Sequence, residues 1–199
     1  MIVREPHPEI TRNLVLLGGR GSGKSSISKR LARLNRNFML FSLDDLIRYE
    51  AEGRSIPEIV EAEGWAGFRE REYSVVHKLS AFDRGALIDC GGGVVVDIDD
   101  SGEEIYSERK VELLRENGLV VYLRRDSRYL YERISGDPNR PLLSGKKSFR
   151  EIMKLRHPWY REAADFEVDC ADLTKDEISN LILAWFYDRT GVFADESSG

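Results

Sequence analysis

The chain has 199 residues, of which 41% are hydrophobic and 33% charged, and its net charge is −5. These values predict one globular domain and argue against general binding to nucleic acid or to membrane surfaces. We expect no signal peptide and no membrane span, because no apolar run has the length of either. Two cysteines, Cys90 and Cys170, are too few for a disulfide framework, so we expect reduced thiols and a cytoplasmic protein.

Short apolar strands alternate along the chain with amphipathic helical patterns. The expected strands are 13–17, 37–43, 86–90, 119–123 and 166–170, and the expected helical segments are 25–34, 44–63 with a break at Gly53, 65–83 and 175–188. Apolar strands separated by helices predict an α/β fold with a parallel sheet that helices cover on both faces. We expect a single domain over residues 1–190 and a disordered tail over residues 191–199.

The segment from Gly18 to Ser25 reads GGRGSGKS and matches the phosphate-binding P-loop pattern GxxxxGK[ST]. It lies between a strand and a helix, so its backbone N–H groups point from a helix N-terminus, where anions bind. Lys24 supplies positive charge for the β- and γ-phosphates, and Ser25 offers a hydroxyl to Mg²⁺. We therefore expect this loop to bind ATP through Gly21, Ser22, Gly23, Lys24, Ser25 and Ser26.

Separated motifs make the chain resemble the shikimate kinase family, P-loop kinases of the nucleoside-monophosphate-kinase-like group. Together they cover about residues 13–164, and in order they are GGRGSGKSS at 18–26, a carboxylate at Asp45, EGRSIPEI at 52–59, GFREREY at 67–73, GGG at 91–93, NRPLL at 139–143 and LRHPWYREAA at 155–164. Each motif alone is weak, but all of them occur in order.

The resemblance implies a three-layer P-loop kinase fold with a five-stranded parallel sheet, helices on both faces and a mobile lid. Residues 135–148, rich in Gly, Pro and basic side chains, suit that lid. The implied activity is transfer of the γ-phosphoryl group of ATP to the 3-hydroxyl of shikimate, in aromatic amino-acid biosynthesis. Mg²⁺ is the implied cofactor, the partners are small-molecule substrates, and the protein is expected to be a monomer.

The resemblance also implies which residues bind the acceptor. Arg69 and Arg156 match arginines that hold the shikimate carboxylate, which suits the forked donors of a guanidinium. Asp45 matches the carboxylate that holds the acceptor hydroxyls and orients the attacking one. The three glycines at 91–93, Gly91, Gly92 and Gly93, match a segment that lines the acceptor site. From the residues alone, the arginines could instead pair with neighbouring glutamates, and Asp44 or Asp45 could cap a helix.

Two further arginines match positions on the ATP side. Arg140, in NRPLL, matches the lid arginine, which reaches the phosphates and stabilises the phosphoryl group in transit. Arg133 matches an arginine that stacks on the adenine. With Lys24 and Asp45, Arg140 completes the set of residues that we expect to act in catalysis.

The chain departs from the family in its second acidic motif. The family has two carboxylates in the pattern D-x-D after its second strand, and the alignment on GRSI puts the second at Asp45 and the first at Leu43. A leucine cannot hold Mg²⁺ or its waters. Asp89 ends the strand before the glycines, where a Walker-B-type carboxylate belongs, so we expect Asp89 to join Ser25 in holding the metal. The alternative is that Asp89 only caps the strand end.

Residues 94–107 form a connection longer than the family's. Their two flanks alternate loosely around Asp-Ser-Gly, which indicates a β-hairpin. Because the segment begins beside the expected acceptor site, three roles are open: a change in acceptor choice, a dimer contact, or decoration of the surface.

Two other functions remain open on the sequence alone. The acceptor could be another hydroxy acid or a polyol such as gluconate, because paired arginines indicate a carboxylate and do not choose the ring. Alternatively, the chain could be a diverged nucleotide-binding paralogue without turnover, which Leu43 alone favours.

Overall fold

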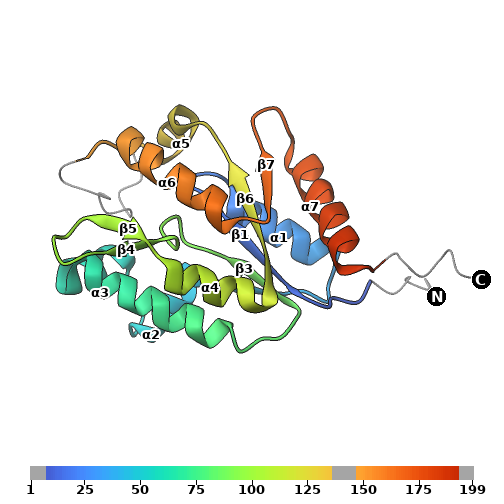
Figure 1. The fold of residues 1–199 in the computed structure, drawn as a ribbon, viewed down its shortest axis with the longest axis horizontal. Coiled ribbons are helices and arrows are strands. Elements are labelled where there is room, and N and C mark those ends of the chain that lie inside the picture. The colour runs from blue at the N-terminus through green and yellow to red at the C-terminus, as the bar shows by residue number, and fades with distance from the viewer. Residues whose placement is uncertain (1–7, 136–146, 193–199) are drawn as a thin grey trace, which may run out of the picture.

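Strands and helices alternate in the computed structural model, which describes residues 8–135 and 147–192 (Figure 1). The strands are β1 (Asn13–Leu17), β2 (Met39–Ser42), β3 (Ala86–Asp89), β4 (Val96–Ile98), β5 (Glu104–Tyr106), β6 (Gly118–Arg124) and β7 (Phe166–Asp169). The helices are α1 (Lys24–Leu34), α2 (Leu43–Glu50), α3 (Ile56–Leu79), α4 (Glu108–Asn117), α5 (Ser127–Ile134), α6 (Phe149–Ala163) and α7 (Lys175–Thr190).

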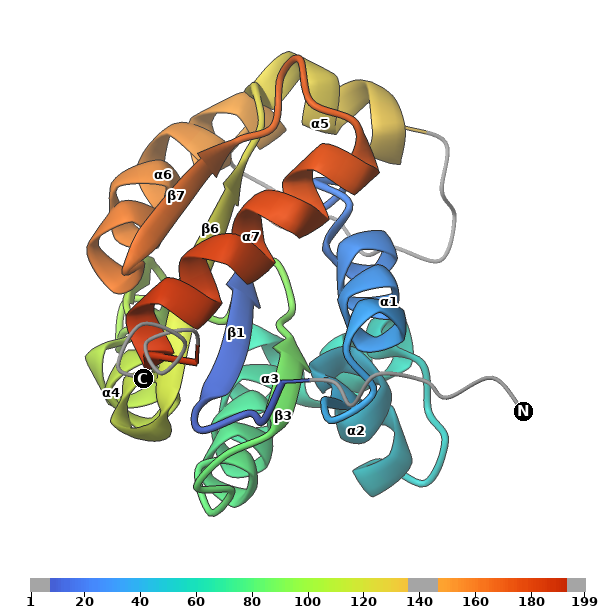
Figure 2. The ribbon, with the colours of Figure 1, turned by 90° about the vertical axis from the view of Figure 1, so that its right-hand side faces the viewer.

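Five of these strands pair in parallel in the order β2-β3-β1-β6-β7, so the sequence prediction of a five-stranded parallel sheet is confirmed. Helices α1 and α7 cover one face of the sheet, and α3, α4 and α6 cover the other (Figures 1 and 2). Successive residues of β1 point to opposite faces: Val15 packs in one core, and Leu14 and Leu16 pack in the other. The described residues thus form the expected three-layer α/β fold.

The strand order places the loops after β1 and β3 side by side. Strand β1 lies between β3 and β6, and the chain leaves β1 through the P-loop and β3 through Gly91. Ligands in open parallel sheets bind at the carboxyl ends of the strands, where the strand order reverses. The register also pairs Ser42, the last residue of β2, with Asp89, the last residue of β3. The ends of three strands therefore converge on one edge of the sheet.

Capping residues and a glycine determine where the two helices between β2 and β3 begin and bend. Ser42 caps α2, because its side chain accepts a hydrogen bond from the N–H of Asp45, so neither Asp44 nor Asp45 is the N-cap. Ser55 and Glu58 form a reciprocal capping box at the start of α3. Gly64 has a φ of 69° and bends α3 between the two helical segments that the sequence predicted. Helix α3 ends at Leu79, a few residues before the predicted end.

A β-hairpin does lie within residues 94–107. Strands β4 and β5 pair antiparallel, with Ile98 opposite Glu104, and Gly102 takes a φ of 81° in the turn. Asp97 ties the base of the hairpin to α4 by accepting hydrogen bonds from Ser107 Oγ at 2.7 Å and Arg109 Nε at 2.8 Å. Burial raises the pKa of Asp97, but these donors outweigh it and hold that pKa at about 2.

A fully buried lysine joins the hairpin to α3. Lys110 Nζ on α4 donates to Glu72 Oε2 at 2.8 Å and to the carbonyl oxygen of Val96 at 2.6 Å, and it lies 3.3 Å from Asp97 Oδ1. Burial lowers the pKa of Lys110, and the neighbouring carboxylates counteract that effect. The amine is therefore held between two elements that are distant in sequence.

The predicted lid and tail fall mostly beyond the residues that the structure describes. Residues 136–146 and 193–199 lie outside them, and so does Arg140. Within the described ranges, no helix is long and apolar enough to cross a membrane.

Replacing Lys110 with alanine should lower the free energy of unfolding by about 3 kcal/mol, because it takes one of two cations from each of the carboxylates Glu72 and Asp97 and leaves a cavity where the buried side chain packed. Urea unfolding followed by circular dichroism measures this. The matched control is Lys78→Ala, which breaks an exposed ion pair with Glu50 and should cost less than about 1 kcal/mol. Equal losses for the two variants would contradict the structural role of Lys110.

Candidate active site

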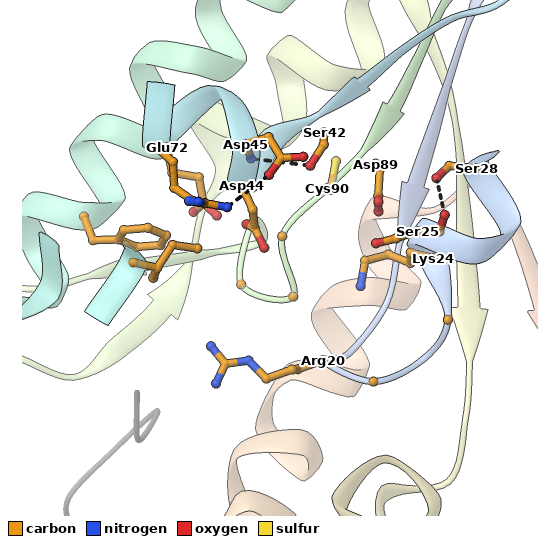
Figure 3. A pocket seen from close by; sticks show the side chains of 18 of the residues that line it. Arg20, Lys24, Ser25, Ser28, Ser42, Asp44, Asp45, Glu72, Asp89 and Cys90 are labelled. Carbon is orange, nitrogen blue, oxygen red and sulfur yellow. Dashed lines mark hydrogen bonds and ion pairs between the residues drawn. The ribbon is translucent and has the colours of Figure 1, made fainter. Parts of the chain in front are cut away.

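A pocket of about 810 Å³ opens at the carboxyl edge of the sheet (Figure 3). The P-loop, the start of α2, the middle of α3 and the loop after β3 all line it. The predicted site residues that line it are Gly21, Gly23, Lys24, Ser25, Ser26, Asp45, Arg69, Asp89, Gly91, Gly92, Gly93, Arg133 and Arg156. Ser22 is not among the described residues that line it; its side chain is buried, and its N–H donates to the carbonyl oxygen of Gly19.

The P-loop has the backbone that phosphate binding requires. Gly21 and Gly23 have φ angles of 87° and 97°, in the left-handed region where a side chain is strained. Lys24 Nζ lies across the loop and donates to the carbonyl oxygens of Gly18 at 2.8 Å and Gly19 at 3.3 Å. Because α1 begins at Lys24, the loop N–H groups and the helix N-terminus favour the same anion.

Asp89 and Ser25 face each other across the loop, as Figure 3 shows. Burial raises the pKa of Asp89, whereas the charge of Lys24 and a hydrogen bond from the Ser25 hydroxyl oppose that effect. A carboxylate and a hydroxyl beside a phosphate-binding loop are the hard oxygen ligands that Mg²⁺ prefers. The described residues contain no cluster of three or more His, Cys, Asp or Glu that could hold a metal. Any Mg²⁺ here would therefore need further ligands from outside the protein, such as phosphate oxygens or water.

Two neighbouring aspartates at the start of α2 lie differently. Asp44 projects toward the glycine loop (Figure 3), so close that a Cβ on Gly91 would lie 2.8 Å from Asp44 Oδ1. Desolvation by the surrounding protein and then the charge of Glu72 raise the pKa of Asp44. The side chain is still exposed to solvent in the pocket. Asp45 instead lies 3.5 Å from Arg48 on the exposed side of the helix, and its charge acts on Asp89. Leu43 is fully buried in the core.

Arg69 lies on the floor of the pocket, held on several sides. Its Nη1 donates to Glu72 Oε2 at 2.8 Å, and its guanidinium lies over the rings of Trp65 and Phe68. Gly93 leaves room for it, because a Cβ there would lie 2.2 Å from Arg69 Nη2. Among the described residues, buried Glu72 Oε1 has no hydrogen-bond partner. Burial opposes the charge of Glu72, but Arg69 and Lys110 outweigh it and keep its pKa below the ordinary value.

Arg156 reaches the same pocket from α6 and is only 2% exposed. Its Nη1 donates to the carbonyl oxygen of Gly92 at 3.2 Å, and the hydroxyl of Tyr160 donates to the same oxygen. Its Nε donates to Glu104 Oε2 on β5 at 2.9 Å. Burial disfavours the charge, yet Glu104 and Tyr160 hold the pKa of Arg156 above its ordinary value. Arg69 and Arg156 thus approach one pocket from different helices.

The sequence predictions missed Arg20 and undervalued Glu72 and Asp44. Arg20, which occupies one of the four variable positions of the P-loop motif, projects into the pocket (Figure 3). We considered Glu72 only as a partner for Arg69. Its spacing of three residues from Arg69 along a helix predicts that ion pair. Asp44 was considered only as a helix cap. Arg133 lines the pocket from α5, where its Nη1 donates to Tyr129 Oη at 3.2 Å.

Comparison with known proteins identifies close relatives. The shikimate kinase family model matches residues 20–187. A curated shikimate kinase of Leptospira biflexa is 43% identical over 173 residues, covering 87% of this chain and 94% of the relative. The solved shikimate kinase from Acinetobacter baumannii in complex with shikimate has a TM-score of 0.76 and 29% identity, covering 89% of this chain and 94% of that one. A gluconokinase from Sinorhizobium meliloti has a TM-score of 0.54 at 16% identity, covers 97% of this chain and 99% of its own, and shares the fold alone.

Replacing Asp44 with asparagine should raise the free energy of unfolding at pH 7. Because folding raises the pKa of Asp44, the negative charge of Asp44 at neutral pH destabilises the native state relative to the unfolded chain. As the pH falls through that raised pKa, native Asp44 takes up a proton and the advantage of the variant shrinks. Urea unfolding at pH 7 and in acid measures both effects.

Asp45→Asn is the matched control, and it should change the stability by less than about 0.5 kcal/mol, as exposed substitutions usually do. A stability gain for Asp44→Asn that is larger in acid than at pH 7 would contradict the assignment.

Proposed function

This chain belongs to the shikimate kinase family, and we propose how its own residues transfer the γ-phosphoryl group of ATP to the 3-hydroxyl of shikimate. It is an ATP-dependent phosphotransferase that acts on a hydroxyl group. The observation that carries the proposal is a single pocket with a P-loop on one side and two buried arginines with a carboxylate on the other.

On the donor side, backbone N–H groups of the P-loop bind the phosphates of ATP. Lys24, which now lies against the carbonyl oxygens of its own loop, turns to the β- and γ-phosphates when they arrive. Arg133 stacks on the adenine from α5, because it borders the loop beside Gly21. Arg140 reaches the phosphates from the predicted lid and helps to exclude water.

On the acceptor side, Arg69 and Arg156 bind the carboxylate of shikimate. Both guanidiniums are buried and already charged, so binding an anion there costs little reorganisation. The backbone of Gly91 to Gly93 lies against both arginines, because Gly93 leaves room for the Arg69 guanidinium and the carbonyl oxygen of Gly92 accepts from Arg156. Acceptors without a carboxylate would leave the remaining N–H donors of the two guanidiniums without an anionic partner in the pocket, which selects against them.

We infer that Asp44, more than Asp45, orients the attacking hydroxyl. Asp44 faces Gly91 and Glu72 within the pocket, and its raised pKa suits a group that accepts a proton from a hydroxyl. Glu72 Oε1 is a second buried oxygen atom that accepts a hydrogen bond from a hydroxyl group of shikimate. A larger loss of turnover for Asp44→Asn than for Asp45→Asn is expected, and the reverse order would support Asp45.

Ser25 and Asp89 would hold Mg²⁺ between them and the phosphates of ATP. The two side chains meet at the base of the loop, and the register brings Ser42 of β2 next to Asp89. A bound Mg²⁺ would supply positive charge that offsets the charge of the phosphates during transfer. Leu43 no longer favours a protein without turnover, because it packs in the core, away from the pocket lining.

We also propose that the protein works in the cytoplasm as a monomer. The support for the cytoplasm is that Cys90 and Cys170 are free and buried, and the monomer is what the resemblance to the family implies. Light scattering of the purified protein tests the oligomeric state.

The acceptor is tested by ATP consumption with shikimate, with gluconate and with no acceptor. Turnover with shikimate alone is expected. Arg69→Lys should raise the KM for shikimate by about 10- to 100-fold, because lysine lacks the forked donors, and should leave the KM for ATP unchanged. Arg71→Lys, whose arginine pairs with Glu63, is the control. Turnover with gluconate, or ATP binding without turnover, would overturn the proposal.

The metal site is tested by replacing Asp89 with asparagine. The concentration of Mg²⁺ needed for half-maximal turnover should rise sharply, about 10-fold or more, because the amide carries no charge to attract the cation. Asp99→Asn, in the distant hairpin turn, is the control. An unchanged Mg²⁺ dependence in Asp89→Asn would exclude this role.

A further inference from the structure

The β4–β5 hairpin packs against α6, the helix that carries Arg156. The rings of Tyr106 on β5 and Trp159 on α6 lie 6.4 Å apart, and Figure 1 shows the hairpin between α3 and α6. Glu104 on β5 meets Arg156 one helical turn before Trp159. The hairpin therefore contacts the acceptor site through a specific side chain, which mere decoration of the surface would not require.

Glu104 binds one edge of the Arg156 guanidinium with both of its oxygens. Nε of Arg156 donates to Oε2 at 2.9 Å, and Nη2 donates to Oε1. Nη1 points to the other side, where it donates to the carbonyl oxygen of Gly92 at 3.2 Å. Such a two-point contact sets both the position and the plane of the guanidinium.

The position of Glu104 relative to the pocket indicates whether it supports Arg156 or competes with the acceptor carboxylate for it. Arg156 lines the pocket, but Glu104 is not among the described residues that do. Its carboxylate therefore lies behind the guanidinium, so it does not stand where an acceptor carboxylate would bind. This geometry argues for support of Arg156 and against competition with the acceptor.

The hairpin that carries Glu104 is anchored at its base. Asp97 of β4 accepts hydrogen bonds from Ser107 and Arg109, and Lys110 donates to the backbone of Val96. Glu104 is thus held by a fixed element, which can in turn fix the long and otherwise flexible side chain of Arg156.

We propose that Glu104 is a positioning residue for the acceptor: it orients Arg156 toward the substrate carboxylate and makes the hairpin part of the acceptor site. The inference rests on the proposed function, because it takes the acceptor to carry a carboxylate. It answers the question of what residues 94–107 do: they support recognition of that carboxylate.

The test is steady-state kinetics of Glu104→Gln with shikimate and ATP. The amide cannot accept two hydrogen bonds from one guanidinium edge, so the KM for shikimate should rise at least 10-fold. The KM for ATP should stay the same, and kcat should change less than threefold. Glu104→Asp keeps the charge but shortens the side chain, so it should give a smaller rise and serves as the measurement if the glutamine variant does not fold.

An acceptor analogue separates positioning from general stability. With a shikimate analogue whose carboxylate is replaced by hydroxymethyl, wild type and Glu104→Gln should have the same KM. Glu103→Gln, the neighbouring residue that pairs with Lys147, is the matched control and should leave the KM for shikimate unchanged.

Three outcomes would overturn the inference, and one of them also overturns the proposed function. An unchanged or lowered KM for shikimate in both Glu104 variants would exclude positioning, and a lowered value would indicate competition with the acceptor. An equal rise with shikimate and with the analogue would indicate a purely structural role. Absence of shikimate turnover in the wild type would overturn the proposed function itself and the inference with it.

Discussion

One buried carboxylate, that of Glu72, supports the arrangement of the pocket. It binds Arg69 on its own helix and Lys110 on α4, and Lys110 in turn holds the base of the β4–β5 hairpin. The two cations repel each other in a region of low dielectric, so neither could be buried there without the shared anion. The floor of the pocket, the hairpin and the helix α3 therefore depend on a single negative charge.

The same rule governs the rest of the site. A pocket for anionic ligands needs cations, and buried cations need counter-charges that do not block the ligand. Glu72 serves Arg69 from beside it, and Glu104 serves Arg156 from behind it. Lys24 lies on backbone carbonyl oxygens of its own loop, a contact that phosphate can replace. The cations are thus charged and oriented before substrate binds, which lowers the cost of reorganisation.

Predictions from the sequence were accurate where the signal lies within one segment. They were weak where the side chains of adjacent residues point in different directions. The P-loop and the strands are contiguous patterns, and the capping residues act within three positions. By contrast, Asp44 and Asp45 are neighbours on a helix, and each step turns the side chain by about 100°. No pattern decides which of them faces the glycine loop, but the packing of α2 on the sheet turns Asp44 toward Gly91. Helices α4, α5 and α6 were not delimited from the sequence.

By itself, the sequence determined the alternation of strands and helices, the phosphate-binding loop, and the chemistry of the side chains available for an acidic acceptor. These depend on periodicity and on motifs within one segment. Only the tertiary structure decided which carboxylate meets which cation. Glu104 and Arg156 are 52 residues apart, and Glu72 and Lys110 are 38 apart. Such pairs form only when packing brings distant elements together. Packing excludes water around both groups, and a charge that has lost its water is strongly destabilising unless it has a partner.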